Sequence, residues 1–215
     1  MSPKRIENSE ARSESAEALS RAVESLKRGE VIVFPTETFY GLGADAFNAA
    51  AVEHVFSLKG RSPNVTIPIL IADEEMLKDV VRELSPLAMR FMHRFWPGPL
   101  TLVLPGKKGL PPGLLNSEGG VGVRISSHPL ATQLVRDLGH PLTATSANPS
   151  AKAPARTVQD ARIYFSEKLE IFLGEERLHG TKGSTVVEVH QDGFKIIREG
   201  EIGLGKLENV RDGYH

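Results

Sequence analysis

The feature that most constrains the fold is the interleaving of short strand-like and helix-like segments along the whole chain. Apolar residues recur with a helical period over residues 14–28, and a β-branched and aromatic run typical of a buried strand follows at residues 31–34. The alternation continues to a last expected strand at residues 194–198. This pattern predicts an α/β fold with helices flanking a sheet. Because the strands are short and their connections irregular, we expect a single domain built on a twisted mixed sheet.

The expected elements divide the 215-residue chain into three parts. A polar N-terminal extension occupies residues 1–13, the domain occupies residues 14–202, and a C-terminal tail occupies residues 203–215. The Gly- and Pro-rich stretch at residues 105–120 is expected to be a mobile loop. Pro68 predicts an edge or bulged strand, because proline cannot donate a hydrogen bond to a neighbouring strand. The expected helices span residues 14–28, 49–58, 73–81, 86–94, 129–138 and 157–165, and the expected strands span residues 31–34, 67–71, 100–104, 121–125, 141–144, 185–189 and 194–198.

The charge balance and the absence of cysteine exclude several classes of function. With 26 basic and 27 acidic side chains the formal net charge is −1, so the chain has no global attraction to nucleic acid or to an anionic membrane. Disulfides, thiolate metal sites and a cysteine nucleophile are excluded. Residues 1–15 lack the apolar core of a signal peptide, and no run approaches the roughly 20 apolar residues of a membrane-spanning helix. We therefore expect a cytoplasmic protein with no membrane partner.

Two hydroxyls and a carboxylate follow the first expected strand. They belong to Thr36, Glu37 and Thr38, and the glycine-containing segment 40–43 comes directly after them. Glycine lets a ligand approach the backbone closely, so this segment suits a binding site. A β-turn with hydroxyl caps would have the same composition, and both interpretations stay open.

Lys59 and Arg61 stand at the end of an expected helix with only Gly60 between them. The glycine frees the backbone to bring both cations to one polyanion, Lys59 as a point charge and Arg61 as a planar fork. The alternative is a structural role, since cations also stabilise the carboxyl end of a helix. The chain has no G-x-x-x-x-G-K-[ST] loop and no G-x-G-x-x-G after a strand, so any nucleotide site here is of another kind.

Arg124 lies inside the apolar run at residues 121–125. A cation there must be paired or must face a cavity, because desolvating it alone is costly. A ligand carboxylate and an internal acidic side chain would satisfy it equally well.

Further hydrogen-bonding groups follow later strands. Residues 143–149, which include Thr145, Ser146 and Asn148, suit contacts with a nucleotide or the capping of a turn. Ser184 and Arg198 stand at strand ends and point either into a shared crevice or into solvent. The histidines show no H-E-x-x-H spacing and the chain has no G-x-S-x-G elbow, so we assign no protein metal ligand and no hydrolase nucleophile.

Seven motifs occur along the chain in an order that resembles the YrdC/Sua5 family of threonylcarbamoyl-AMP synthases, over about residues 15–202. The resemblance implies a YrdC-like fold around a large basic cavity and a nucleotidyltransferase of the short YrdC type. The implied reaction joins L-threonine, bicarbonate and ATP, with Mg²⁺ accompanying ATP, into L-threonylcarbamoyladenylate and pyrophosphate. The motifs are FPTETFYGLGA at residues 34–44, KGR at 59–61, WPGPLT at 96–101, GVR at 122–124 with HP at 128–129, TSAN at 145–148, STVV at 184–187, and IR at 197–198 with Gly200.

The resemblance also implies a role for individual residues. Threonine would be bound through its carboxylate by Arg124, and ATP through its phosphates by cations, with a carbamate formed from threonine as the attacking group and no protein nucleophile. Carried over motif by motif, Lys59 and Arg61 are the catalytic residues; Lys59, Arg61, Ser146, Asn148 and Arg198 bind ATP; Thr38, Arg124, Thr145 and Ser184 bind threonine.

Two positions depart from the family pattern. Ala72 stands where the longer Sua5-type members carry a histidine that helps to hold threonine, and residues 150–154 lack a glycine and a serine that the family usually has. Part of the ATP contact is therefore expected to be remodelled.

The implied product serves the N6-threonylcarbamoyl modification of adenosine 37 in tRNA (t6A). Downstream tRNA threonylcarbamoyl-transferase proteins are therefore the expected partners. Two other functions compete with this one: a YrdC-like module that binds double-stranded RNA or tRNA without catalysis, and a carbamoyl-adenylating domain.

Overall fold

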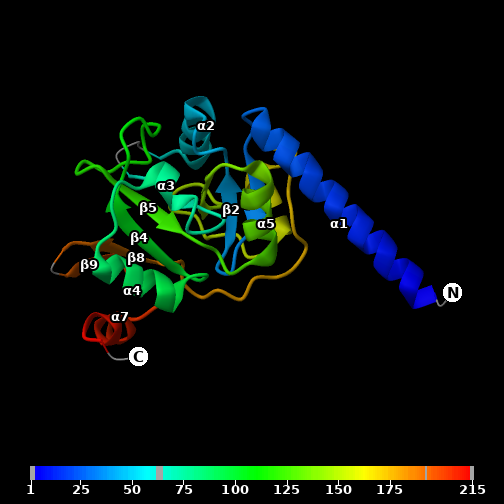
Figure 1. The fold of residues 1–215 in the computed structure, drawn as a ribbon. Helices are drawn as coiled ribbons and strands as arrows, with labels where there is room; N and C mark the ends of the chain where they lie inside the picture. Colours follow the sequence, from blue (N-terminus) through cyan, green and yellow to red (C-terminus); the bar gives the residue numbers. More distant parts are fainter. Residues whose placement is uncertain (1–2, 62–64, 192, 214–215) are drawn as a thin grey trace.

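The structure is a computed structural model, which describes residues 3–61, 65–191 and 193–213. Its strands form two sheets, one of six strands and one of three, with helices around them (Figure 1). The elements in chain order are α1 (Pro3–Lys27), β1 (Ile32–Pro35), β2 (Tyr40–Gly43), α2 (Ala49–Lys59), β3 (Ile69–Leu70), α3 (Leu77–Val80), α4 (Pro86–Phe95), β4 (Leu100–Pro105), β5 (Gly120–Arg124), α5 (Pro129–Leu138), β6 (Leu142–Thr143), β7 (Thr145–Ser146), α6 (Val158–Phe165), β8 (Thr185–Val189), β9 (Phe194–Arg198) and α7 (Leu204–Arg211).

The six-stranded sheet has the order β6-β3-β5-β4-β8-β9. Strands β3 and β5 run parallel, as do β4 and β8, and the other neighbours are antiparallel. The expected α/β fold with a mixed sheet and flanking helices is therefore confirmed. The three-stranded sheet, which we did not predict as a separate unit, is antiparallel and has the order β1-β2-β7.

The chain passes from the larger sheet to the smaller one at a single residue. Ala144 lies between β6 and β7, and its backbone N–H donates to the carbonyl of Pro68 at 2.8 Å. Thr145 and Ser146 then pair with Leu42 and Gly41 of β2. The two sheets therefore meet at this crossing, and each contributes a wall to the space between them.

Helix α1 extends beyond its predicted start. Its apolar period begins near residue 16, yet the helix itself begins at Pro3, so the expected N-terminal extension is helical where the structure describes it. The end of the helix is anchored: Ala22 and Leu26 are fully buried and join the side chains of α5 in one apolar cluster. Figure 1 shows the first half of α1 projecting away from the rest of the molecule.

Several boundaries differ from the sequence prediction. Pro68 precedes β3, an interior strand of two residues between β6 and β5 whose pairings show no register shift, so the prediction of an edge or bulged strand was wrong. The helix expected at residues 73–81 is only α3, because Asp73 caps a turn instead: its Oδ1 accepts from the N–H of Met76 at 3.1 Å. Tyr40–Gly43 forms a strand that was not among the expected ones.

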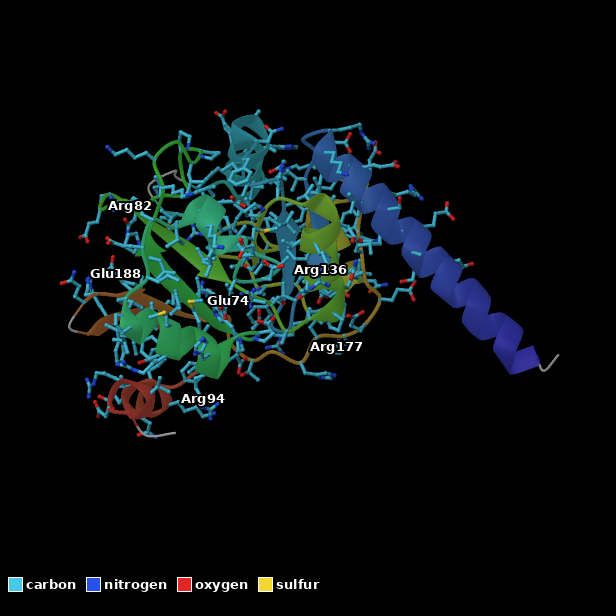
Figure 2. All side chains as sticks on the ribbon, in the orientation of Figure 1. Glu74, Arg82, Arg94, Arg136, Arg177 and Glu188 are labelled. Atoms are coloured by element: carbon cyan, nitrogen blue, oxygen red, sulfur yellow. The ribbon has the colours of Figure 1, made fainter. Side chains whose placement is uncertain are left out.

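The connection between β4 and β5 is packed against the domain. Leu114 is fully buried, and the Asn116 side chain accepts from the backbone N–H of Gly120 at 2.7 Å. Charged side chains such as Arg82, Arg94 and Arg136 lie exposed on the outside of the molecule (Figure 2). Within the part of the chain that the structure describes, no helix combines the length and the apolar character needed to cross a bilayer.

Candidate active site

A cavity of about 690 Å³ lies between the two sheets, and every residue that we predicted to bind ATP or threonine lines it. Its walls come from β2 and β7 of the smaller sheet and from β4, β5, β8 and β9 of the larger one. The predicted residues in the lining are Thr38, Lys59, Arg61, Arg124, Thr145, Ser146, Asn148, Ser184 and Arg198. Residues as far apart in the sequence as Thr38 and Arg198 thus surround one cavity.

Lys59 is the last residue of α2, and only 4% of it is exposed. Its Nζ donates to the carbonyls of Ser146 at 2.6 Å and Asn148 at 2.9 Å. Burial, with a smaller contribution from the charge of Arg61, lowers the pKa of Lys59 to about 8. The ammonium group is therefore fixed in the cavity wall and carries a charge that titrates near neutral pH.

Gly60 explains how two neighbouring cations reach the same cavity. Its φ of 56° places it in the left-handed region, where it caps α2 and reverses the chain. The N–H of Arg61 then donates back to the carbonyl of Phe56 at 3.2 Å. Arg61 is half-buried, and this burial lowers its pKa. Residues 62–64, which follow Arg61, lie outside the described part.

Arg198 ends β9 at the mouth of the cavity and is joined to Ser184. Its Nη2 donates to the carbonyl of Ser184 at 2.8 Å and to the hydroxyl of Ser184 at 3.1 Å. Although Arg198 is exposed, partial desolvation and the charges of Arg124 and Arg61 lower its pKa. The cations of this cavity therefore repel one another, and a polyanion placed among them would be stabilised.

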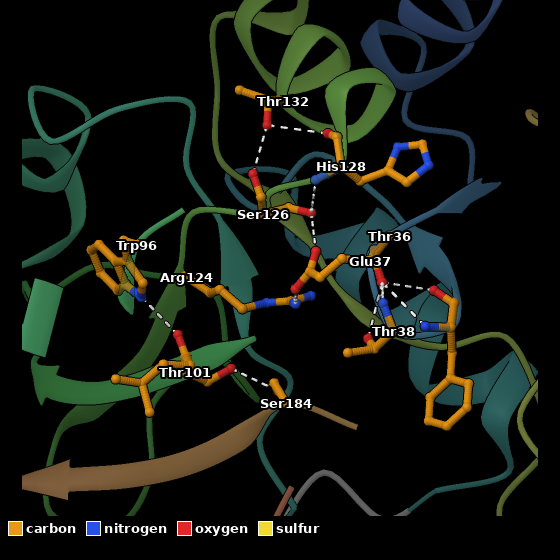
Figure 3. Close-up of polar contacts among 12 residues, drawn as sticks. Thr36, Glu37, Thr38, Trp96, Thr101, Arg124, Ser126, His128, Thr132 and Ser184 are labelled. Atoms are coloured by element: carbon orange, nitrogen blue, oxygen red, sulfur yellow. Dashed lines mark hydrogen bonds and ion pairs between the residues drawn. The ribbon is translucent and has the colours of Figure 1, made fainter. Parts of the chain in front are cut away.

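Thr101 is a cavity residue that sequence reasoning did not single out. Its hydroxyl forms a hydrogen bond of 2.9 Å with the hydroxyl of Ser184, and both residues are buried (Figure 3). Strands β4 and β8 place them side by side, because Thr185 pairs with Leu100 in the parallel register. The WPGPLT motif ends at Thr101, so the motif itself was the available signal.

Thr36 and Thr38 form one side of the cavity. The Thr36 hydroxyl donates to the carbonyl of Phe39 at 2.7 Å and lies 3.1 Å from the Thr38 hydroxyl. This is the hydroxyl-capped turn that composition suggested, and both residues also line the cavity.

Arg124 is paired with an acidic side chain of the protein, which is one of the two possibilities that the sequence left open. Only 5% of it is exposed, and its Nη1 donates to Oε1 of Glu37. Burial lowers the pKa of Arg124, and the Glu37 carboxylate opposes that effect. Arg124 nevertheless remains in the cavity wall, so an ion pair and a ligand contact are both available to it.

Asn148 lines the cavity, and its side chain is held by neighbouring backbone carbonyls. Its amide nitrogen donates to the carbonyls of Pro149 at 2.9 Å and Lys152 at 2.8 Å. Its Oδ1 is buried and has no hydrogen-bond partner among the described residues. A buried acceptor without a partner is costly.

The two departures from the family pattern lie in different surroundings. Ala151 lines the cavity at a φ of 65°, a left-handed conformation that favours glycine. Ala72 is 5% exposed, belongs to the smaller apolar cluster, and is not among the described residues that line the cavity.

Comparison with known proteins identifies the family. The Sua5/YciO/YrdC family model, described as telomere recombination, matches residues 24–200. The chain belongs to the Sua5/YciO/YrdC family. The threonylcarbamoyl-AMP synthase of Thiobacillus denitrificans is 42% identical over 149 residues, which cover 69% of this chain and 79% of that protein.

Solved structures of other Sua5/YciO/YrdC proteins have the same fold. Pyrococcus abyssi Sua5, crystallised with L-threonine, gives a TM-score of 0.85 at 33% identity, covering 89% of this chain and 56% of that chain. This chain therefore spans about half the length of the archaeal protein. Escherichia coli YciO gives a TM-score of 0.78 at 26% identity, covering 86% of this chain and 90% of that chain.

Proposed function

We propose that this protein is an L-threonylcarbamoyladenylate synthase, which joins L-threonine, bicarbonate and ATP and releases pyrophosphate. The observation that carries the proposal is the convergence of all nine predicted substrate contacts on one cavity between the two sheets. Its relative from Thiobacillus denitrificans carries the name threonylcarbamoyl-AMP synthase, and Pyrococcus abyssi Sua5 binds L-threonine.

We assign the threonine site to Arg124 and the hydroxyls around it. A guanidinium group recognises a carboxylate through two parallel hydrogen bonds, and Arg124 has donors left after its contact with Glu37. Thr38, Thr145 and Ser184 line the same cavity and supply hydroxyls for the polar groups of threonine.

We assign the ATP site to Lys59, Arg61 and Arg198, with Ser146 and Asn148 beside them. Three cations that repel one another when the cavity is empty lose that repulsion when phosphates lie between them. Ser146 and Asn148 also hold Lys59, because their backbone carbonyls accept from its Nζ.

We propose that a magnesium ion arrives on the phosphates of ATP. Among the described residues, no group of three His, Asp or Glu side chains could hold a metal. Mg²⁺ commonly binds substrate phosphates and retains its waters, and there it would neutralise phosphate charge. The protein's own part is then to hold the triphosphate in place.

The chemistry needs positioning more than it needs a protein nucleophile. The amine of threonine adds to CO₂ derived from bicarbonate and gives a carbamate. A carbamate oxygen attacks the α-phosphorus of ATP, the bond from that phosphorus to the bridging oxygen breaks, and pyrophosphate leaves. Lys59, Arg61 and Arg198 stabilise the negative charge that develops on the phosphates, while Arg124 holds the threonine in line.

Pyrophosphate release from ATP and bicarbonate, measured with each amino acid in turn, tests the proposal. We expect release that depends on threonine, and a strong fall in its rate in Lys59→Ala and Arg61→Ala. Arg124→Ala should raise the threonine concentration needed for half-maximal rate. Release that does not depend on threonine would refute the activity, and unchanged rates in the lysine and arginine variants would refute the phosphate assignment.

The same assay separates the two competing functions. A carbamoyl-adenylating domain would consume ATP without a requirement for threonine. An RNA-binding module would bind through exposed phosphate contacts that weaken steeply with salt, whereas Lys59 and Arg124 are buried. We further propose that the adenylate passes to tRNA threonylcarbamoyl-transferase proteins, because an acyl-adenylate is too reactive to accumulate.

A further inference from the structure

Glu37 and Arg124 form an ion pair across the boundary between the two sheets. Arg124 ends β5 of the larger sheet, and Glu37 lies in the turn between β1 and β2 of the smaller one. The side chain of Arg124 is 6% exposed and that of Glu37 is 15% exposed. Figure 3 shows the guanidinium group reaching toward the Glu37 carboxylate.

The two members of this pair have different relations to the cavity. Arg124 is among the residues that line it, and Glu37 is not among the described residues that do. Glu37 therefore contacts the guanidinium without occupying the substrate space. Its neighbours Thr36 and Thr38, by contrast, both line the cavity.

Glu37 is itself held in place by a chain of hydrogen bonds. Its Oε2 accepts from the hydroxyl of Ser126, whose oxygen in turn accepts from the backbone N–H of His128 at 3.2 Å. The hydroxyl of Thr132 donates to the carbonyl of Ser126 at 2.8 Å. These contacts run into the first turn of α5 and leave the carboxylate with both oxygens engaged (Figure 3).

We propose that Glu37 is a positioning residue, which orients the guanidinium of Arg124 toward the carboxylate of threonine and is itself fixed by Ser126. The inference rests on the proposed function. Recognition of a carboxylate by two parallel hydrogen bonds requires the plane of the guanidinium to be set before the ligand arrives. A carboxylate that accepts from Nη1 restricts how the guanidinium turns, and it offsets the cost of a buried cation while the site is empty.

Calorimetric titration with threonine and, separately, with ATP tests this role. Glu37→Gln keeps the shape of the side chain and removes its charge, so we expect the threonine dissociation constant to rise about 10- to 100-fold, as for other residues that orient a ligand-binding group. The ATP dissociation constant should stay within about twofold. Ser126→Ala, which leaves the ion pair intact, should give a smaller rise for threonine of about threefold to tenfold.

A matched control and a double-mutant cycle separate positioning from folding. Glu176 is another carboxylate in this region, and its Oε1 lies 2.6 Å from Nε2 of His128 outside the cavity. Glu176→Gln should leave both dissociation constants unchanged. In an Arg124→Ala background, Glu37→Gln should have no further effect on threonine binding, because Glu37 acts through Arg124.

The outcomes distinguish this inference from the proposed function. Wild-type protein that neither binds threonine nor releases pyrophosphate with it would overturn both. Wild-type protein that binds threonine, with Glu37→Gln binding it equally well, would overturn the positioning role alone. Equal weakening of threonine and ATP binding, or an effect of Glu37→Gln that persists without Arg124, would show instead that Glu37 supports the fold.

Discussion

Lys59 is held inside the protein as a cation that is unusually easy to discharge. Two backbone carbonyls fix its ammonium group, and burial brings its pKa to about 8. Its ordinary value is 10.5, so between the two values the unfolded chain binds a proton that the folded protein does not. The cost of burying the charge is present below pH 8 and is relieved as the pH rises through 8 toward 10.5.

ATP binding should therefore weaken with rising pH. Between pH 7 and pH 9 most Lys59 side chains lose their proton, so we expect the ATP dissociation constant to rise by about tenfold. Calorimetry over this range measures the effect. The variant Lys59→Met should bind ATP weakly with little pH dependence, and a wild-type slope in that variant would contradict the assignment.

Ala151 is a residue whose backbone conformation suits glycine better than alanine. The left-handed region costs a non-glycine residue about 1–2 kcal/mol, and glycine costs about 0.5–1 kcal/mol in unfolded-state entropy. With a φ of 65° at Ala151, Ala151→Gly should raise the free energy of unfolding by about 0.5–1 kcal/mol in urea denaturation. Ala153 lies in the same exposed loop but has no positive φ, so Ala153→Gly should lower the free energy of unfolding.

At the scale of elements, the end of α1 is attached to the domain by a small apolar contact with α5. Leu26 is fully buried there. Leu26→Ala should lower the free energy of unfolding by about 2–4 kcal/mol, because it leaves a cavity in the smaller cluster. Glu17 is exposed on the same helix, and Glu17→Ala should change the free energy of unfolding by less than about 0.5 kcal/mol. Chemical denaturation measures both, and a small loss for Leu26→Ala would mean that α1 docks weakly.

Local patterns predicted the elements that depend on local interactions. Helix α5 has the bounds that its apolar period and flanking Pro129 and Gly139 indicate, and β8 and β9 match their β-branched runs. Strand β2 was missed because its two glycines carry no strand signal. Tyr40–Gly43 is a strand because it pairs with β1, which directly precedes it, and with β7, which lies far along the chain. The start of α1 was missed because its first residues carry no apolar period to reveal it.

The candidate site was predicted residue by residue from motifs, and all nine residues line the cavity. Their roles in binding ATP and threonine stay predictions. What the sequence could not reveal is which contacts link them. Arg124 and Glu37 are 87 positions apart, and nothing local distinguishes Glu37 from the other acidic residues as the partner. The Thr101 contact with Ser184 likewise depends on the register of two strands that are distant in the chain.

At the scale of the whole molecule, the single-residue crossing at Ala144 couples the two sheets to the site. Backbone hydrogen bonds from Thr143 to Ala44 and from Ala46 to Pro141 reinforce this crossing, next to Thr145 and Ser146 in the cavity wall. A ligand that favours one mutual orientation of the sheets would, by reciprocity, be bound more tightly by any change that stabilises that orientation.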